Sequence, residues 1–215
     1  MAVEAARIVG RDQAIHAIEL QNSQIHRALA VNEDKGIETL FTLSNVTSVQ
    51  TGPETSTVTA NFACDACLQK GSDVFTSIAS GKLIMSLGTP SSSALVEYPK
   101  EAGLGMLDVN CEEFYAYLAS IGYNYADLFR GITSMKRCCD LAQGEIITST
   151  ASQSGPMDEF LLHPSTLDVA FQAIFAAISY PGDGALWALH IPTTIRRVVI
   201  NPVICPLNGG LDEKV

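Results

Sequence analysis

Residues 160–180 carry the strongest helix signal in the chain and constrain its fold the most. Pro164 and Ser165 supply a start signal for this helix, and Pro181-Gly182 supplies a stop. Alanines occupy much of the opposite face, so we expect a helix that is buried on all sides within a packed core. Its apolar residues recur at the i, i+3, i+4, i+7 spacing of one helix face: Leu167, Ala170, Phe171, Ile174, Phe175 and Ile178.

Two strongly polar side chains interrupt this apolar helix. Asp168 and Gln172 are four residues apart, so they lie on one side of the helix, one turn from each other. Spacing alone allows two interpretations of Asp168: a carboxylate favoured by the helix dipole near a Ser165 cap, or a functional acid. Burial would favour its protonated form, whereas a place in the first helical turn would favour the carboxylate. Gln172 either makes a structural hydrogen bond or contacts a substrate.

Composition narrows the class of protein. The 215 residues are 47% hydrophobic and only 17% charged, which indicates a globular chain. A formal net charge of −10 argues against nucleic acid or an anionic membrane as the main partner. The sequence shows neither a membrane-spanning run nor a secretory signal, so we expect a cytoplasmic protein. The six cysteines are scattered, and Cys64-Asp-Ala-Cys67 lacks a second ligand pair, so we expect small buried hydrophobes and no metal site.

The order of the predicted elements suggests two similar halves. A helix over residues 1–9 is followed by alternating, strand-like segments up to residue 90, which fit an antiparallel sheet. After a linker at 91–107, Asn110 and Glu113 form a capping box for a second helix. A strand pair over 129–150, the helix near 164–178 and a long strand over 186–200 complete the chain. We therefore expect an α+β fold whose halves, 1–90 and 108–215, each wrap a curved sheet around a helix.

Several segments resemble the dehydratase domain of fungal-type highly reducing polyketide synthases. His163-Pro-Ser-Thr-Leu-Asp-Val-Ala-Phe-Gln172 is similar to that family's His-Pro-x-x-Leu-Asp-x-x-x-Gln motif. Tyr125-Ala-Asp-Leu-Phe129 resembles its Tyr-Gly-Pro-x-Phe segment, although Ala126-Asp127 replaces Gly-Pro. Further similarity lies in residues 1–6, 75–81, 114–132, 180–197 and 201–202. The resemblance implies a double hotdog fold, and we expect this chain to lack edge strands of that fold at both its N- and C-termini.

The resemblance also implies an activity. Family members remove water from 3-hydroxyacyl chains on an acyl carrier protein, giving 2,3-enoyl thioesters, with a His as base and the motif Asp as acid. Asp168 matches that acid, and the resemblance places Gln172, Tyr125, His163 and Pro164 at the substrate. It implies no cofactor other than the carrier protein's phosphopantetheine. The implied partners are the acyl carrier protein and the other domains of a synthase, itself expected to be homodimeric. Basic residues that could meet an acidic carrier, unless they are separate solvated charges, are Arg130, Lys136, Arg137, Arg196 and Arg197.

The expected base is missing from this sequence. In the family it lies in a His-x-x-x-Gly-x-x-x-x-Pro segment upstream of the residues that match Met1, and the four histidines present lie in other contexts: His16, His26, His163 and His190. We therefore expect this chain alone to be inactive as an enzyme. The alternative function is a catalytically inactive hotdog remnant that binds acyl chains or serves as a docking module. A hotdog thioesterase is disfavoured, because it would need a water-activating acid in a different place.

Overall fold

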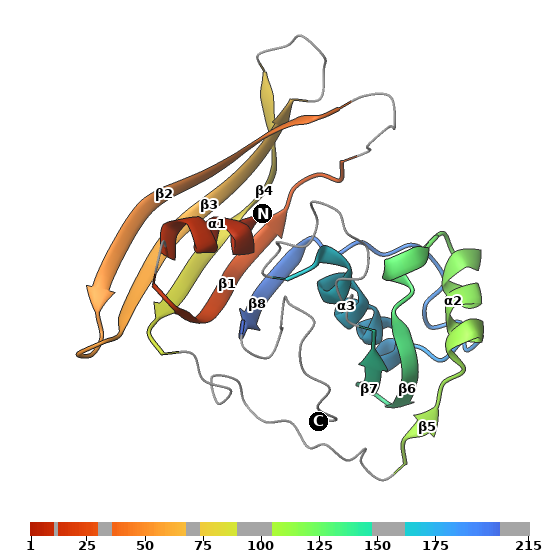
Figure 1. Ribbon diagram of the computed structural model, residues 1–215. Coiled ribbons are helices and arrows are strands. Elements are labelled where there is room, and N and C mark those ends of the chain that lie inside the picture. Colours follow the sequence, from red (N-terminus) through yellow and green to blue (C-terminus); the bar gives the residue numbers. More distant parts are fainter. Residues whose placement is uncertain (11–12, 30–35, 68–73, 90–104, 148–161, 203–215) are drawn as a thin grey trace. The chain divides into compact units, whose positions relative to one another are not determined.

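The computed structural model describes the whole chain except residues 11–12, 30–35, 68–73, 90–104, 148–161 and 203–215. It divides into two compact units (Figure 1), which we describe separately. Apart from these gaps, the first unit comprises residues up to 89 together with 192–202, and the second comprises 105–191. The first unit therefore draws on two separate stretches of the sequence.

The first unit is a five-stranded antiparallel sheet with a short helix against it. The strand order is β2-β3-β4-β1-β8, and the helix α1 (Ala2–Gly10) packs against β4 and β1. The predicted alternation is confirmed: β3 buries every second residue, from Val58 to Ala66. The strands are β1 (Ile15–Ile25), β2 (Glu38–Gln50), β3 (Ser56–Cys67), β4 (Phe75–Leu87) and β8 (Thr194–Ile200).

Two of the register shifts in this sheet contain an asparagine with a positive φ. In β1 the register shifts between Gln21 and Gln24, and Asn22 lies in the left-handed region with φ 49°. In β2 the register shifts between Ser44 and Thr47, where Asn45 has φ 52°. Asparagine tolerates this conformation better than most residues, and a bulge kinks the strand and increases its twist. The two asparagines therefore supply local bends in a sheet predicted to be curved.

Gly81 of β4 permits a close approach of an aromatic ring. It lies directly opposite Phe62 of β3, and a Cβ atom at position 81 would be 2.7 Å from the Phe62 ring. Phe62 also stacks on Phe41 of β2, with ring centroids 5.8 Å apart. Because no side chain projects from Gly81, the Phe62 ring can cover this part of the sheet.

The second unit packs two helices against a small sheet. The sheet has the order β5-β6-β7, and α3 packs against β7, β6 and the short helix η2. Its core includes Phe114, Leu118, Met135 and Val169. Its elements are β5 (Leu107–Asp108), α2 (Cys111–Ser120), η2 (Asp127–Phe129), β6 (Ile132–Cys138), β7 (Leu141–Ile146) and α3 (Pro164–Ile178).

Local sequence signals predict the two helices of this unit well. The Asn110 side chain accepts hydrogen bonds from the backbone N–H groups of Glu112 and Glu113, at 3.0 and 3.3 Å, so the predicted cap is confirmed. The expectation that α3 is buried on all sides is wrong, because Ile174 and Ile178 are 53% and 54% exposed. The sheet and η2 cover only one side of the helix, so fewer residues are buried than the apolar pattern of the sequence predicts. The buried residues of α3 are Ser165, Val169, Gln172 and Ala176.

The predicted strand over 186–200 is correct only from Thr194 onward. The preceding segment is irregular. Near its beginning, the Asp183 carboxylate stabilises a turn by accepting three hydrogen bonds. The donors are the Ser179 hydroxyl and the backbone N–H groups of Tyr180 and Ala185, at 2.6, 2.6 and 2.8 Å. These bonds hold the pKa of Asp183 below its usual value. β8 lies in the half predicted over 108–215. In the structure it pairs with β1 and so belongs to the first unit.

Candidate active site

His163 and Pro164 begin the helix that carries Asp168. Nδ1 of His163 accepts a hydrogen bond from the Ser165 backbone N–H at 3.2 Å and lies 2.6 Å from the Ser165 hydroxyl oxygen. His163 is therefore the N-cap, and the expectation that Ser165 fills this position is wrong. Pro164 occupies the first helical position, where a missing N–H breaks no helical bond. These contacts start the helix, and a substrate contact by either residue stays a prediction.

Asp168 lies outside the first turn of α3. It is the fifth residue of the helix, whereas the dipole favours a carboxylate mainly within the first turn. The structure therefore weakens the interpretation of Asp168 as a carboxylate placed there for the dipole. Its side chain is half-buried, and its Oδ2 atom accepts a hydrogen bond from Nε2 of Gln172 at 2.9 Å. Of the two interpretations left open for Gln172, this contact is the structural hydrogen bond.

Gln172 is fully committed to protein contacts. Its side-chain amide also donates to the Phe129 carbonyl at 2.9 Å, and its Oε1 accepts a hydrogen bond from the Tyr115 hydroxyl at 2.9 Å. The residue is only 1% exposed, and both amide hydrogens are used. This geometry supports a role in holding Asp168 over direct contact with substrate.

Tyrosines form an aromatic cluster beside the carboxylate. Tyr125 packs edge-on against Tyr115, with ring centroids 6.4 Å apart, and stacks on Tyr123 at 5.9 Å. Burial, and secondarily the negative charge of Asp168, raise the pKa of Tyr125 to about 12. Tyr125 is therefore a neutral phenol near Asp168, and its contact with a substrate stays a prediction. Tyr115 was not among the predicted site residues, because a tyrosine beside Phe114 on an amphipathic helix has the pattern of a core residue.

The C-terminal end of α3 is held as firmly as its start. Arg137 of β6 donates from Nε to the Ala176 carbonyl at 2.5 Å and from Nη2 to the Ala177 carbonyl at 3.1 Å. The Asp140 backbone N–H adds a third bond, to Ala177 at 3.2 Å. These donors satisfy carbonyls that a helix end leaves without partners. Asp168 is thus presented from a helix fixed at both ends.

The other basic residues proposed for a carrier surface are mostly paired within their own unit. Arg130 contacts Glu112 at 2.7 Å, and Lys136 lies 3.6 Å from Asp108. Arg197 pairs with Glu19 at 2.6 Å, which contributes to lowering the pKa of that carboxyl. Exposed pairs of this kind contribute little to stability, and each leaves less free charge for a partner.

The histidines are also hydrogen-bonded within their own units. His16 Nδ1 lies 3.0 Å from the Thr89 carbonyl, His26 Nε2 lies 2.9 Å from the Ser80 hydroxyl, and His190 Nδ1 lies 2.7 Å from the Ala188 carbonyl. With His163 serving as a helix cap, all four have local partners. Local contacts therefore single out none of them as the base.

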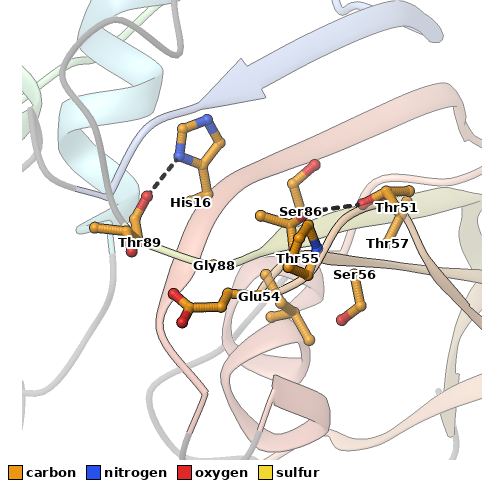
Figure 2. Close-up of a pocket in the computed structure, with 11 residues that line it drawn as sticks. His16, Thr51, Glu54, Thr55, Ser56, Thr57, Ser86, Gly88 and Thr89 are labelled. Atoms are coloured by element: carbon orange, nitrogen blue, oxygen red, sulfur yellow. Dashed lines mark hydrogen bonds between the residues drawn. The ribbon is translucent and has the colours of Figure 1, made fainter.

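A hollow of about 560 Å³ lies elsewhere, in the first unit. Figure 2 shows its lining of hydroxyl side chains with His16 and Glu54, and it contains none of the predicted site residues. Within the described ranges, no three His, Cys, Asp or Glu side chains gather as metal ligands would. Nor does that part of the chain contain a helix with the length and apolarity to cross a membrane.

Sequence comparison points to one family. Residues 99–211 match the family described as polyketide synthase dehydratase N-terminal domain, which is just over half of the chain. The hybrid PKS-NRPS synthetase buaA of Petromyces alliaceus is 44% identical over 212 residues, covering 98% of this chain and 5% of the relative. The highly reducing polyketide synthase milA of Cordyceps militaris is 45% identical over 207 residues, covering 94% and 8%. The chain thus spans less than a tenth of these relatives' length.

Solved structures agree on the fold. The dehydratase domain from the CurF module of curacin polyketide synthase has a TM-score of 0.66 at 19% identity, covering 91% of this chain and 64% of that one. CurK dehydratase is similar in two variants described as inactive, one with an aspartate changed to asparagine and one with a histidine changed to phenylalanine. Each has a TM-score of 0.58, covering 90% of this chain and 63% of its own, at 19% and 20% identity. These matches confirm the predicted α+β hotdog fold, and with the sequence match they show that the chain belongs to the polyketide synthase dehydratase family.

Proposed function

We propose that this chain supplies the acid of a dehydratase that acts on 3-hydroxyacyl chains carried by the phosphopantetheine of an acyl carrier protein. The observation that carries the proposal is the setting of Asp168. It lies on a helix fixed at both ends, one carboxylate oxygen is held by Gln172, and neutral tyrosines lie beside it. A carboxyl group with one oxygen held and an apolar surface beside it suits general acid catalysis.

The chemistry requires two groups. A base removes a proton from C2, the electron pair forms the C2–C3 double bond, and the C3–O bond breaks. Protonated Asp168 gives its proton to the departing hydroxyl, which leaves as water. The expected base is the family's histidine, which this sequence does not contain in its motif. The inactive aspartate and histidine variants of CurK support a need for both residue types in that protein.

The aromatic cluster suggests how a substrate would be held. Tyr125 presents a ring and a phenol that stays protonated, which can donate a hydrogen bond to a hydroxyl or thioester oxygen. We place the acyl chain along this cluster, beside Asp168, at the N-terminal half of α3 that His163 and Pro164 begin. Other synthase domains and a second copy of the parent synthase are the proposed partners.

An external base makes the acid testable in this chain. The protein is incubated with a 3-hydroxyacyl pantetheine thioester and increasing imidazole, and enoyl thioester is measured by absorbance. We expect imidazole-dependent product that falls on the order of a hundredfold or more in Asp168→Asn. Asp140→Asn is the matched control, because Asp140 lies in the β6–β7 turn and tolerates asparagine at its φ of 60°. Equal rates for wild type and Asp168→Asn would remove Asp168 from the chemistry.

The second candidate is an acyl-binding module without catalysis. The local hydrogen bonds of all four histidines favour it. If the wild-type chain binds a 3-hydroxyacyl pantetheine in calorimetry but gives no enoyl product at any imidazole concentration, this second function is the correct one.

A further inference from the structure

A chain of hydrogen bonds leads from a backbone N–H to the carboxylate of Asp168. The backbone N–H of Ile132 donates to the Tyr115 hydroxyl oxygen at 3.1 Å. The Tyr115 hydroxyl donates to Oε1 of Gln172 at 2.9 Å. The Gln172 amide then donates to Oδ2 of Asp168 at 2.9 Å, so two side chains and three hydrogen bonds connect β6 to the candidate acid.

Each step of this chain has only one possible direction. The Ile132 N–H can only donate, so the Tyr115 oxygen accepts there and its single proton is free to be donated to Gln172. On its other side Gln172 faces two acceptors, the Phe129 carbonyl and Asp168. An amide turned by 180° would direct its oxygen at both acceptors and its N–H₂ at the Tyr115 proton. The Tyr115 hydroxyl and the Phe129 carbonyl therefore act together to keep the N–H₂ end of the Gln172 amide toward Asp168.

We propose that Tyr115 is a positioning residue, which together with the Phe129 carbonyl fixes the Gln172 amide so that it donates to Oδ2 of Asp168 and leaves Oδ1 to carry the proton given to the substrate. This inference rests on the proposed function for its chemical meaning. An N–H donor at Oδ2 disfavours a proton on that oxygen, so the protonated acid has its hydrogen on Oδ1. Through Gln172, Tyr115 thus favours Oδ1 over Oδ2 as the oxygen that carries the acid proton.

The surroundings of Tyr115 suit this role. The residue is 5% exposed, and the Arg130 guanidinium lies over its ring, 5.0 Å from the centroid. Arg130 is itself held by Glu112 at 2.7 Å. Burial raises the pKa of Tyr115, so the hydroxyl keeps its proton throughout the range in which an aspartic acid titrates. A hydroxyl that stays protonated over that range keeps its hydrogen bond to the Gln172 amide.

NMR tests the role directly in the intact chain. We expect the Tyr115 hydroxyl proton to be visible through slow exchange, with a nuclear Overhauser effect to the Gln172 side-chain amide. In Tyr115→Phe the ring packing against Phe114 and Tyr125 is kept and only the hydroxyl is lost. The Gln172 amide hydrogens should then exchange faster by on the order of tenfold, the loss of about one hydrogen bond.

Tyr117→Phe is the matched control. Tyr117 is on the same helix, but its hydroxyl donates to the Leu186 carbonyl and not to Gln172, so Gln172 exchange should not change. In the imidazole assay Tyr115→Phe should lower kcat by on the order of tenfold with KM unchanged, because it leaves the substrate surface intact.

The outcomes separate this inference from the proposed function. Unchanged Gln172 exchange in Tyr115→Phe, or a wild-type hydroxyl proton without an Overhauser effect to Gln172, overturns the positioning role even if Asp168→Asn abolishes turnover. Faster exchange together with a lower kcat supports it. Should Tyr115→Phe fail to fold, the wild-type hydroxyl measurement still decides. Turnover that does not change in Asp168→Asn overturns the proposed function and the assignment of Oδ1 as the acid oxygen. The exchange rate of the Gln172 amide hydrogens still tests the hydrogen bond from Tyr115 to Gln172.

Discussion

Gly81 offers a sharp test of how the first sheet is packed. A methyl group at this position would lie 2.7 Å from two ring carbons of Phe62 and 3.0 Å from the Cα of Ser23. Ordinary carbon–carbon contacts are about 3.5–4.0 Å. The ring would have to move by roughly the difference, about 1 Å, away from the position in which it stacks on Phe41. Overpacking of this kind costs about 1–3 kcal/mol, and the better strand propensity of alanine offsets only about 0.5–1 kcal/mol.

We therefore expect Gly81→Ala to lower the free energy of unfolding by about 1–2 kcal/mol, measured by urea denaturation followed by circular dichroism. Gly36→Ala is the matched control, because no atom of the residues that the structure describes lies within 4 Å of the added carbon. Gly36→Ala should leave the free energy of unfolding unchanged or raise it slightly, because alanine lowers the conformational entropy of the unfolded chain. The double variant Gly81→Ala, Phe62→Leu should lose less free energy of unfolding than the sum of the losses in the two single variants. If Gly81→Ala unfolds at the same urea concentration as wild type, or the double variant is simply additive, the packing argument is refuted.

Two further predictions concern the site. Arg137→Met removes both guanidinium hydrogen bonds to the end of α3 and should lower the free energy of unfolding in urea by about 1.5–3 kcal/mol. Arg137→Lys should lose less, because a positive charge remains at the helix C-terminus. A loss below about 0.5 kcal/mol in Arg137→Met would show that water replaces the guanidinium bonds. Because the pKa of Tyr125 is raised to about 12 from its ordinary 10, its stabilising contribution is complete below pH 10 and is lost as pH rises from 10 to 12. Stability should fall less steeply over that range in Tyr125→Phe, and identical slopes would contradict the raised pKa.

The sequence predicted the elements whose signals are local. The cap at Asn110, the helix starting at Pro164 and the alternation in β3 each depend on neighbouring residues, and all three are present. The predicted strand over 186–200 began too early, because a carboxylate at Asp183 holds a turn that hydropathy does not record. The narrow burial of α3 was also not predictable, since it depends on which elements cover the helix.

The candidate site was predictable in part. The resemblance singled out Asp168 and Gln172, and their hydrogen bond needs only the four-residue spacing of a helix. The link to Tyr115 joins residues 57 positions apart, and no periodicity predicts a contact over such a distance. The cap role of His163 was hidden because serine is the more usual cap and stands two residues later.

The pairing of β8 with β1 has a consequence for synthesis of the protein. Arg197 of β8 and Glu19 of β1 are in contact although they are 178 residues apart in the sequence. On the ribosome, β1 therefore emerges long before β8. The edge of β1 that pairs with β8 stays open while the intervening residues are translated. Open strand edges pair readily with other chains, and long-range pairing is slow to form. Production of this chain should thus be limited by aggregation of nascent or newly released protein, and slower translation of residues 100–190 should prolong that exposure.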